Sequence, residues 1–350
     1  MRPLPLRCVR PTNIKHEAAE GGKMTEAPVA VIIAAYNAAS TIGASVSSAL
    51  ADPLVGEVVV VDDASTDGTR AAAMAVDDGT GRLRIIVQLA NAGPSAARNV
   101  AIAGSSSPLL AILDADDLLV PGRFAPLLAL PDWDFVADNI VFVRELPDLD
   151  QLVRSLPTRQ ATQVLRLGDF VLSNISRHGK QRAEMGFIKP VFRRKAFEKL
   201  ALRYDEALRL GEDFIIYAQA LARGARFLLT DRCGYIAIER QDSLSGQHST
   251  DDLAALLDAG RGLAGESIAS DTARTALASY LRALTVKVRH RQVLEAKSHK
   301  GSGAALLELL RKPTLAPGVI HAVINDKFRP VSNEARSPTR MLFNWPNSSG

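Results

Sequence analysis

The sequence predicts an α/β fold, with a mostly parallel sheet flanked by helices and a helical C-terminal region. Four apolar runs rich in β-branched residues begin 26 to 28 residues apart, at Val29, Glu57, Leu83 and Leu109. Alanine- and serine-rich segments that suit helices lie between these runs. Strands and helices alternating at this spacing are typical of right-handed βαβ units, which build a parallel sheet covered on both faces. From about Asp251 onward the pattern is that of helices.

Each later element follows from a local pattern. The segment 133–143 (WDFVADNIVFV) predicts a fifth strand, and 186–194 (GFIKPVFRR) indicates a buried segment that leads into a helix. Phe214, Ile215 and Ala218 lie on the apolar stripe of another helix, which also includes Leu221. The predicted helices cover 40–50, 67–76, 94–104, 195–202, 209–224, 251–264, 273–296 and 303–312.

Composition excludes several classes of protein. A length of 350 residues with 47% hydrophobic content allows one large or two ordinary domains. A net charge of +4 and only 5% aromatic residues argue against nucleic acid as a partner. Cys8 and Cys233 lie far apart and form no metal-binding spacing, which favours a reducing cytosol. No apolar run has the length of a membrane span, and residues 1–27 are expected to be a disordered leader, with Met24 as an alternative start.

Polar side chains gather where the four predicted strands end. Tyr36 and Asn37 follow the first strand, Asp62 and Asp63 the second, the NAG sequence at 91–93 the third, and the DADD sequence at 114–117 the fourth. In open α/β sheets, ligands bind outside the carboxyl ends of the strands. Helix caps alone explain one Asp or Ser at each junction, but they do not explain paired carboxylates at two junctions. The sequence therefore predicts a ligand site at this edge.

The DADD turn offers several carboxylates directly after a buried strand. Asp116 and its neighbours supply hard oxygen ligands that suit Mg²⁺ or Mn²⁺, with phosphate oxygens completing the coordination. The motif alone occurs often by chance, but its place at the end of the fourth strand makes it more specific. Arg98, on the helix after the third strand, can either bind a phosphate or pair with a carboxylate.

The cluster after the second strand suits a nucleoside. Carboxylates such as Asp62 and Asp63 can accept hydrogen bonds from a base N–H or from ribose hydroxyls. The sequence has no GxGxxG after the first strand and no GK[ST], so neither a dinucleotide fingerprint nor a Walker loop is present. A capped turn, with Asp67 or Ser65 capping the next helix, is compatible with ligand binding.

Five motifs, in this order and spacing, resemble those of family 2 inverting glycosyltransferases with the GT-A fold. They are AAYNAASTI, VVVDDASTDGT, NAGPSAARN, LLAILDADDLLVPGRF and LGEDF, and they span roughly 29–240. Bacterial transferases that build exopolysaccharide on a polyprenyl-phosphate carrier, including succinoglycan glucosyltransferases, look most similar. The resemblance implies a glycosyltransferase domain over 28–245, with a nucleotide-binding half (28–130) and an acceptor half (131–245). A helical, basic region (246–330) and a flexible tail (331–350) are expected to follow.

The resemblance also implies roles for individual residues. Asp213 corresponds to the general base and Asp116 to the metal ligand, with Glu212 and Asp117 as supporting residues. Asp114 is expected to bind the ribose or the sugar. The remaining nucleotide-binding residues are expected to be Ala34, Tyr36 (beside the uracil), Asn37, Asp62, Asp63 (accepting the base N–H) and Arg98. Ala34 departs from the family, in which many members carry Pro, Thr or Ser, so any contact with the base at this position must come from the backbone.

These roles imply an inverting, metal-dependent transfer of a hexose, with glucose favoured, from a UDP-sugar to a lipid-linked saccharide. A single displacement, with Asp213 taking the proton of the acceptor hydroxyl, gives a β-linkage from an α-linked donor. A sugar-nucleotide sensor without turnover is a rival reading. A sugar-1-phosphate nucleotidyltransferase is disfavoured because AAYNAASTIG contains no Lys or Arg, and a glycoside hydrolase leaves the nucleoside-like clusters unexplained.

The C-terminal third is basic. Between Arg282 and Arg329, ten Lys or Arg residues face three Asp or Glu residues. Such a helical segment suits either an anionic membrane surface or solvent. The expected location is the cytoplasm, with peripheral contact at the cytoplasmic face of the inner membrane as the alternative that would bring the enzyme to a polyprenyl-diphosphate-linked acceptor. The segment 240–245 (RQDSLS) is expected to form a lid over the donor.

Overall fold

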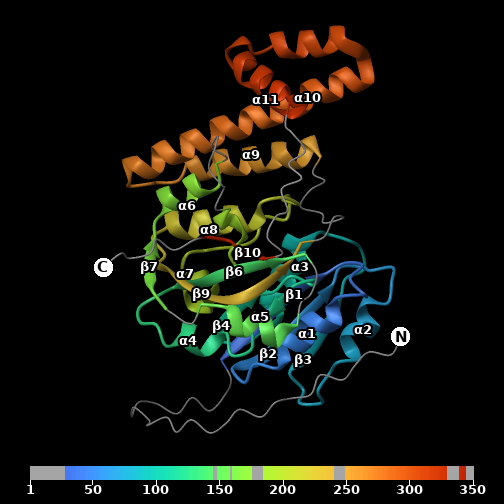
Figure 1. Cartoon of the computed structure of the whole chain (residues 1–350), viewed down its shortest axis with the longest axis vertical. Coiled ribbons are helices and arrows are strands. Elements are labelled where there is room, and N and C mark those ends of the chain that lie inside the picture. The colour runs from blue at the N-terminus through green and yellow to red at the C-terminus, as the bar shows by residue number, and fades with distance from the viewer. Residues whose placement is uncertain are drawn as a thin grey trace.

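The computed structural model describes residues 28–144, 148–157, 160–175, 184–239, 249–328 and 339–343 (Figure 1). The strands form one sheet with the order β3-β2-β1-β4-β8-β6-β9-β5, to which β10 adds beside β6 and β7 beside β9. The expected leader (1–27) and the expected lid (240–245) lie outside the described residues.

The N-terminal half confirms the predicted βαβ series. β1 (Val29–Ala35) pairs in parallel with β2 (Val55–Asp62) and with β4 (Leu109–Ile112), and β3 (Leu83–Val87) pairs in parallel with β2. The connecting helices are α1 (Ile42–Leu50), α2 (Thr69–Met74) and α3 (Pro94–Gly104). Buried side chains fill both faces of β1, as expected for a parallel strand covered by helices. The register aligns the carboxyl ends of these strands, so their polar loops share one edge.

The second half of the sheet mixes strand directions. β8 (Val191–Arg193) runs antiparallel to both β4 and β6 (Phe135–Val143), and β6 pairs in parallel with the long β9 (Phe227–Ile238). β5 (Leu118–Leu119) and β7 (Thr162–Leu165) pair antiparallel with β9. The fifth predicted strand and the buried segment before α7 are confirmed, whereas β9 has no counterpart among the predicted elements.

The remaining helices pack beside and above the sheet (Figure 1). They are α4 (Phe124–Leu128), α5 (Leu149–Ser155), α6 (Leu167–Ser173), α7 (Arg194–Lys199), α8 (Glu212–Ala222), α9 (Thr250–Ala264), α10 (Asp271–Leu310) and α11 (Ala316–Phe328), with short 3-10 turns η1 (Met185–Phe187) and η3 (Pro313–Leu315). α10 is two helices joined at Gly301, whose φ of 81° breaks the helical backbone. This break matches the boundary between the two helices predicted at 273–296 and 303–312.

The C-terminal helices pack against helices that cover the second half of the sheet. α9 and α10 lie across α6 and α8 (Figure 1), and α9 begins with a capping box at Ser249. Phe214 of α8 stacks on Phe170 of α6 with ring centroids 5.3 Å apart, and on Tyr280 of α10 at 4.5 Å. Aromatic pairs of this kind fix the position of α8 and therefore of the carboxylates at its first turn.

Part of the expected flexible tail belongs to the sheet. β10 (Thr339–Met341) pairs antiparallel with β6, and Arg340 lies over the ring of Phe142 at 3.7 Å while its Nη2 is 2.6 Å from Glu239. Strand pairing and this cation–π contact thus connect residues 339–341, within the expected tail, to the sheet. Among the described helices, none combines the length and the apolar character needed to cross a membrane.

Candidate active site

The loops after β1 and β2 hold each other through short polar contacts. Asn37 adopts φ 49°, donates its backbone N–H to Ser65 Oγ (2.9 Å) and accepts the backbone N–H of Thr66 on Oδ1 (2.8 Å). Asn tolerates this left-handed conformation better than most residues. Tyr36 is half exposed at the end of β1, and Ala34 lies in β1 opposite Val61. Asn37, which is expected to bind the nucleotide, therefore also connects the loops after β1 and β2.

The paired carboxylates after β2 are buried and hydrogen-bonded. Asp62 Oδ1 accepts the backbone N–H of Ser65 at 2.9 Å. Asp63 accepts three hydrogen bonds at 2.8 Å, from Gln88 Nε2 and from the backbone N–H groups of Ala92 and Gly93. Asp63 therefore fastens the NAG loop to the end of β2 and brings the second and third clusters together. Its Oδ2 accepts one of these bonds, so it has capacity for a further donor such as a base N–H.

The DADD turn is anchored from β9. Asp117 accepts a hydrogen bond from the Tyr235 hydroxyl (2.8 Å) and one from the backbone N–H of Ile238 (3.0 Å), and the same hydroxyl accepts the backbone N–H of Asp114 (3.1 Å). Burial, together with the charges of Asp114 and Asp116, raises the pKa of Asp117 to about 8. Asp117 therefore fixes the position of the turn, whereas the neighbouring Asp116 is partly exposed.

Two buried cations and three carboxylates close an ionic ring at the centre of the edge. Arg98 Nη2 is 2.9 Å from Asp114 Oδ1, and its Nη1 is 2.7 Å from Glu212 Oε1 and 3.3 Å from Asp213 Oδ1. Lys189 Nζ lies 2.8 Å from both Asp114 Oδ2 and Asp213 Oδ2. The ring joins the end of β4 to the first turn of α8, segments about a hundred residues apart in the chain. The predicted site residues on α3, β4 and α8 are therefore brought together.

The ring shifts the titration of its members. Burial alone would raise the pKa of Asp114, but Lys189 and Arg98 outweigh it and lower that pKa to about 2. Burial would lower the pKa of Arg98 and of Lys189, but the surrounding carboxylates outweigh it and raise both above their usual values. Arg98 and Lys189 are therefore charged. The sequence allowed Arg98 either to bind a phosphate or to pair with a carboxylate, and in this structure its partners are carboxylates.

Lys189 is a site residue that the motifs do not include. It is 5% exposed, and the buried Arg123 donates to its backbone carbonyl while forming a bidentate pair with Asp138. The signal in the sequence is a lysine inside a segment expected to be buried, since a buried lysine requires an anionic partner. The partners themselves come from distant segments and follow only from the tertiary structure.

Asp213 is placed by the helix that it begins. Gly211 precedes α8 with φ 74°, a conformation that favours glycine, and a Cβ there would lie 2.8 Å from Leu256 Cδ1. Asp213 is 7% exposed; Lys189 donates to its Oδ2, whereas its buried Oδ1 accepts no hydrogen bond from the described residues. Arg98 Nη1 forms an ion pair with this oxygen at 3.3 Å, but a buried carboxylate oxygen that accepts no hydrogen bond is rare. A hydroxyl of a bound molecule would satisfy it.

Comparisons with known proteins show the family of the chain. The sequence model described as Glycosyl transferase family 2 matches residues 30–200. The succinoglycan biosynthesis protein ExoU of Rhizobium meliloti is 45% identical over 314 residues, which is 88% of this chain and 91% of that protein. The chain belongs to glycosyl transferase family 2. The UDP-Glc:alpha-D-GlcNAc-diphosphoundecaprenol beta-1,3-glucosyltransferase WfgD of Escherichia coli is 31% identical over 116 residues, which is 33% of this chain and 44% of that enzyme.

Solved structures show the same fold as this glycosyltransferase. S. aureus TarS 1-349 in complex with UDP-GlcNAc has a TM-score of 0.59 at 18% identity, covering 85% of this chain and 80% of that chain. The mannosyltransferase PcManGT from Pyrobaculum calidifontis, in complex with GDP-Man and Mn2+, has a TM-score of 0.51 at 19% identity, covering 86% and 87%. The predicted GT-A fold is therefore confirmed.

The donor set at the DADD turn of this glycosyltransferase is compatible with a divalent ion. The described residues contain no cluster of three or more side chains that could hold a metal alone. Asp116 is a partly exposed carboxylate of this turn, beside Asp114, which contacts two cations, and Asp117, which accepts two hydrogen bonds. One protein carboxylate completed by phosphate oxygens is a common way to hold Mg²⁺ or Mn²⁺. The residues fit a metal that arrives with a diphosphate.

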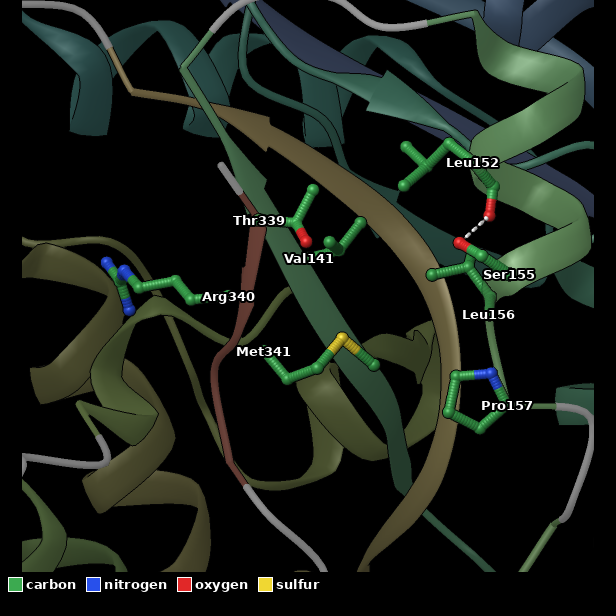
Figure 2. A pocket seen from close by; sticks show the side chains of 8 residues that line it. All are labelled: Val141, Leu152, Ser155, Leu156, Pro157, Thr339, Arg340 and Met341. Carbon is green, nitrogen blue, oxygen red and sulfur yellow. Dashed lines mark hydrogen bonds between the residues drawn. The ribbon is translucent and has the colours of Figure 1, made fainter. Parts of the chain in front are cut away.

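Two cavities in the described part of this glycosyltransferase lie away from the strand-end site. One, of about 250 Å³, lies between α5 and β10, where Thr339 and Met341 face the helix and Arg340 extends away from it (Figure 2). It is lined by Val141, Leu152, Ser155, Leu156, Pro157, Thr339, Arg340 and Met341. The second, of about 310 Å³, lies on α10 beside Glu308. Neither cavity is lined by a residue of the ionic ring, so the candidate active site is identified from the ring and not from these cavities.

Proposed function

We propose that this chain is an inverting, metal-dependent hexosyltransferase that moves a sugar from a UDP-sugar to a lipid-linked saccharide during exopolysaccharide synthesis of the succinoglycan type. Family membership and the extent of the match to ExoU support a transferase in such a pathway. The structure of TarS with UDP-GlcNAc supports a UDP-sugar donor. WfgD, named as a transferase from UDP-Glc to a diphosphoundecaprenol-linked sugar, supports a polyprenyl-diphosphate-linked acceptor. Glucose is the proposed sugar, with residues 28–130 as the nucleotide-binding half and 131–245 as the acceptor half.

The buried Oδ1 of Asp213 carries this proposal. It forms an ion pair with Arg98 Nη1 at 3.3 Å but accepts no hydrogen bond from the described residues, and Lys189 links its carboxylate to Asp114 at the donor-side turn. An acceptor hydroxyl placed there can give its proton to Asp213 while its oxygen forms a bond to the anomeric carbon. The bond from that carbon to the diphosphate oxygen breaks on the opposite face, and UDP leaves with the electron pair. One such displacement inverts the anomeric configuration.

The donor side is proposed to hold a diphosphate at Asp116. A bound Mg²⁺ or Mn²⁺ supplies positive charge against the leaving diphosphate. Asp114 is proposed to bind the ribose or the sugar; each of its oxygens contacts one cation and its side chain is 33% exposed, so it has capacity for a further donor. Arg98 is proposed to act beside the diphosphate, and its pairs with Asp114 and Glu212 hold its guanidinium next to the DADD turn.

The nucleoside is proposed to lie along the ends of β1 and β2. Tyr36 is exposed enough to flank the uracil, and Asp63 Oδ2 has capacity to accept the base N–H. Asn37, Asp62 and the backbone at Ala34 complete the proposed pocket. A lipid-linked acceptor places the reaction at the cytoplasmic face of the inner membrane, with the protein bound there peripherally.

The test is UDP release from a panel of UDP-sugars by the purified protein, with Mn²⁺, with Mg²⁺ and with chelator, in the presence of bacterial lipid extract. We expect one donor to be turned over, with stimulation by lipid and by metal, and we expect Asp116→Asn and Asp213→Asn each to lower turnover by at least about a hundredfold. Metal-dependent binding of UDP without turnover of any donor would favour the sensor reading. Absence of both binding and turnover would contradict the assignment of the strand-end clusters.

A further inference from the structure

The far end of α10 and the start of α11 expose an apolar patch. Five of the eleven large hydrophobic side chains that the described residues expose lie between Leu294 and Ile320. Leu306, Leu307 and Leu310 are 57%, 68% and 58% exposed. Single exposed apolar residues are ordinary, whereas a concentration in one short segment marks an interaction surface. We call residues 291–320 the tip.

The short helix from Gly301 to Leu310 keeps its charged side chain largely buried and exposes its apolar side chains. Its charged residue, Glu308, is 15% exposed and accepts Arg289 Nη1 at 2.6 Å, while Arg289 Nη2 donates to the Glu308 carbonyl at 2.8 Å. Leu306 and Leu310 lie two positions to either side of Glu308, which at 100° per residue places them on the opposite face. The helix therefore holds its carboxylate against α10 and presents leucines to solvent, the reverse of the usual amphipathic arrangement.

The tip also exposes several basic side chains. The exposed basic residues of the tip are Arg291, Lys297, Lys300, Arg311 and Lys312. Its two carboxylates have partners: Glu295 accepts the hydroxyl of Thr250, and Glu308 pairs with the guanidinium of Arg289 and, at 2.8 Å, with that of the exposed Arg311. The surface offered by the tip thus combines aliphatic side chains with an excess of positive charge. This combination matches the boundary between acyl chains and anionic headgroups.

The tip projects from the body of the protein. Its part in α10 lies at the end of the molecule farthest from the sheet (Figure 1), and His290 is the last buried residue of α10. From there the helix continues for about 15 Å to Gly301. α11 returns along α10, with Val319 buried and Gly318 close against Val286. The tip is therefore a supported projection that can reach a flat surface.

We infer that the tip docks on an anionic lipid bilayer, with Leu306, Leu307 and Leu310 entering the acyl boundary and the basic residues binding headgroup phosphates. A second copy of the chain is the other occupant that could cover the leucines. Its own cluster of basic residues would then face this one, so the charge favours lipid. The surface is separate from the strand-end site and does not depend on the proposed donor or acceptor.

The test is flotation of the full chain with vesicles of phosphatidylcholine, with and without phosphatidylglycerol. Binding is expected only with phosphatidylglycerol. Leu306→Ser/Leu307→Ser/Leu310→Ser is expected to lower partitioning at least about tenfold, since each leucine loses apolar burial. Arg311→Gln/Lys312→Gln is expected to lower it about fivefold for each charge removed. Leu89→Ser is the matched control, because Leu89 is fully exposed but lies outside the tip.

Unchanged thermal melting of each variant shows that folding is intact. UDP release in detergent with a soluble acceptor is expected to be unaffected, which separates this inference from the proposed function. The inference is overturned if the wild type ignores anionic vesicles, or if the triple variant binds them as the wild type does. It is also overturned if the triple variant converts a dimer to a monomer by light scattering without any change in vesicle binding, because the patch is then a contact between copies.

Discussion

Lys189→Met is the substitution that probes the ionic ring most sharply. Lys189 Nζ contacts Asp114 and Asp213 at 2.8 Å each, and the lysine side chain is 6% exposed. Methionine fills similar volume but removes the charge, so Arg98 alone is left to neutralise three carboxylates. Breaking a buried ion pair by removing one partner typically costs about 3–5 kcal/mol. Because the Asp114 side chain is 33% exposed, solvent screens part of the loss, and we expect the lower figure.

The free energy of unfolding is expected to fall by about 3 kcal/mol in urea denaturation followed by circular dichroism, and Tm by about 4 °C. Lys195→Met, at an exposed lysine of α7, is the matched control and is expected to stay within about 0.5 kcal/mol of the wild type. Turnover by Lys189→Met is expected to fall at least about tenfold, measured well below its Tm, because Asp213 loses the contact that fixes its carboxylate.

A double-mutant cycle with Asp213→Asn separates the pair from a general packing effect. Once Asp213 is neutral, the loss of Lys189 leaves less uncompensated charge, so the two changes are expected to couple by about 1–3 kcal/mol. A coupling below about 0.5 kcal/mol, or a single variant as stable as the wild type, would refute the ring as a structural unit.

Two further predictions concern other parts of the fold. Gly211→Ala is expected to lower the free energy of unfolding by about 2–4 kcal/mol, because the new methyl group clashes with Leu256 and the backbone is left-handed there. Gly224→Ala is the control: its φ is also positive but its surroundings are open, so a loss of only about 1–2 kcal/mol is expected. Equal losses of the two variants in urea denaturation would contradict the clash. Burial raises the pKa of the Cys233 thiol to about 12, so in a Cys8→Ser background Ellman's reagent at pH 8 is expected to react only after denaturant is added; rapid reaction of the folded protein would contradict this burial.

The regular half of the fold could be predicted because its signals are local. Continuous valine and isoleucine runs gave β1 to β4, and each run ended in polar residues that the parallel register then placed on one edge. β9 was missed because FLLTDRCGYIAI includes polar residues within the strand. In the structure Thr230 and Asp231 are buried, and Asp231 accepts the backbone N–H of Ala161 at 2.8 Å.

The ionic ring could be predicted only in part. The motifs identify Arg98, Asp114, Glu212 and Asp213, but which of them pair depends on the docking of α8 beside β4. Lys189 belongs to a segment with no motif, and its place is set by the buried Arg123, which binds its carbonyl. Sequence patterns reveal which side chains are unusual for their position, whereas long-range packing decides which of them meet.

The most direct test of the central claim is the turnover number of Asp213→Asn, measured with the donor that the wild type uses. If Asp213 is the base, kcat is expected to fall by about 10²–10⁴-fold while the affinity for UDP, measured by calorimetry with metal present, stays near that of the wild type. Glu212→Gln, one residue away and paired with Arg98, is expected to lose less turnover. An Asp213→Asn variant that turns over its donor as fast as the wild type would contradict the account.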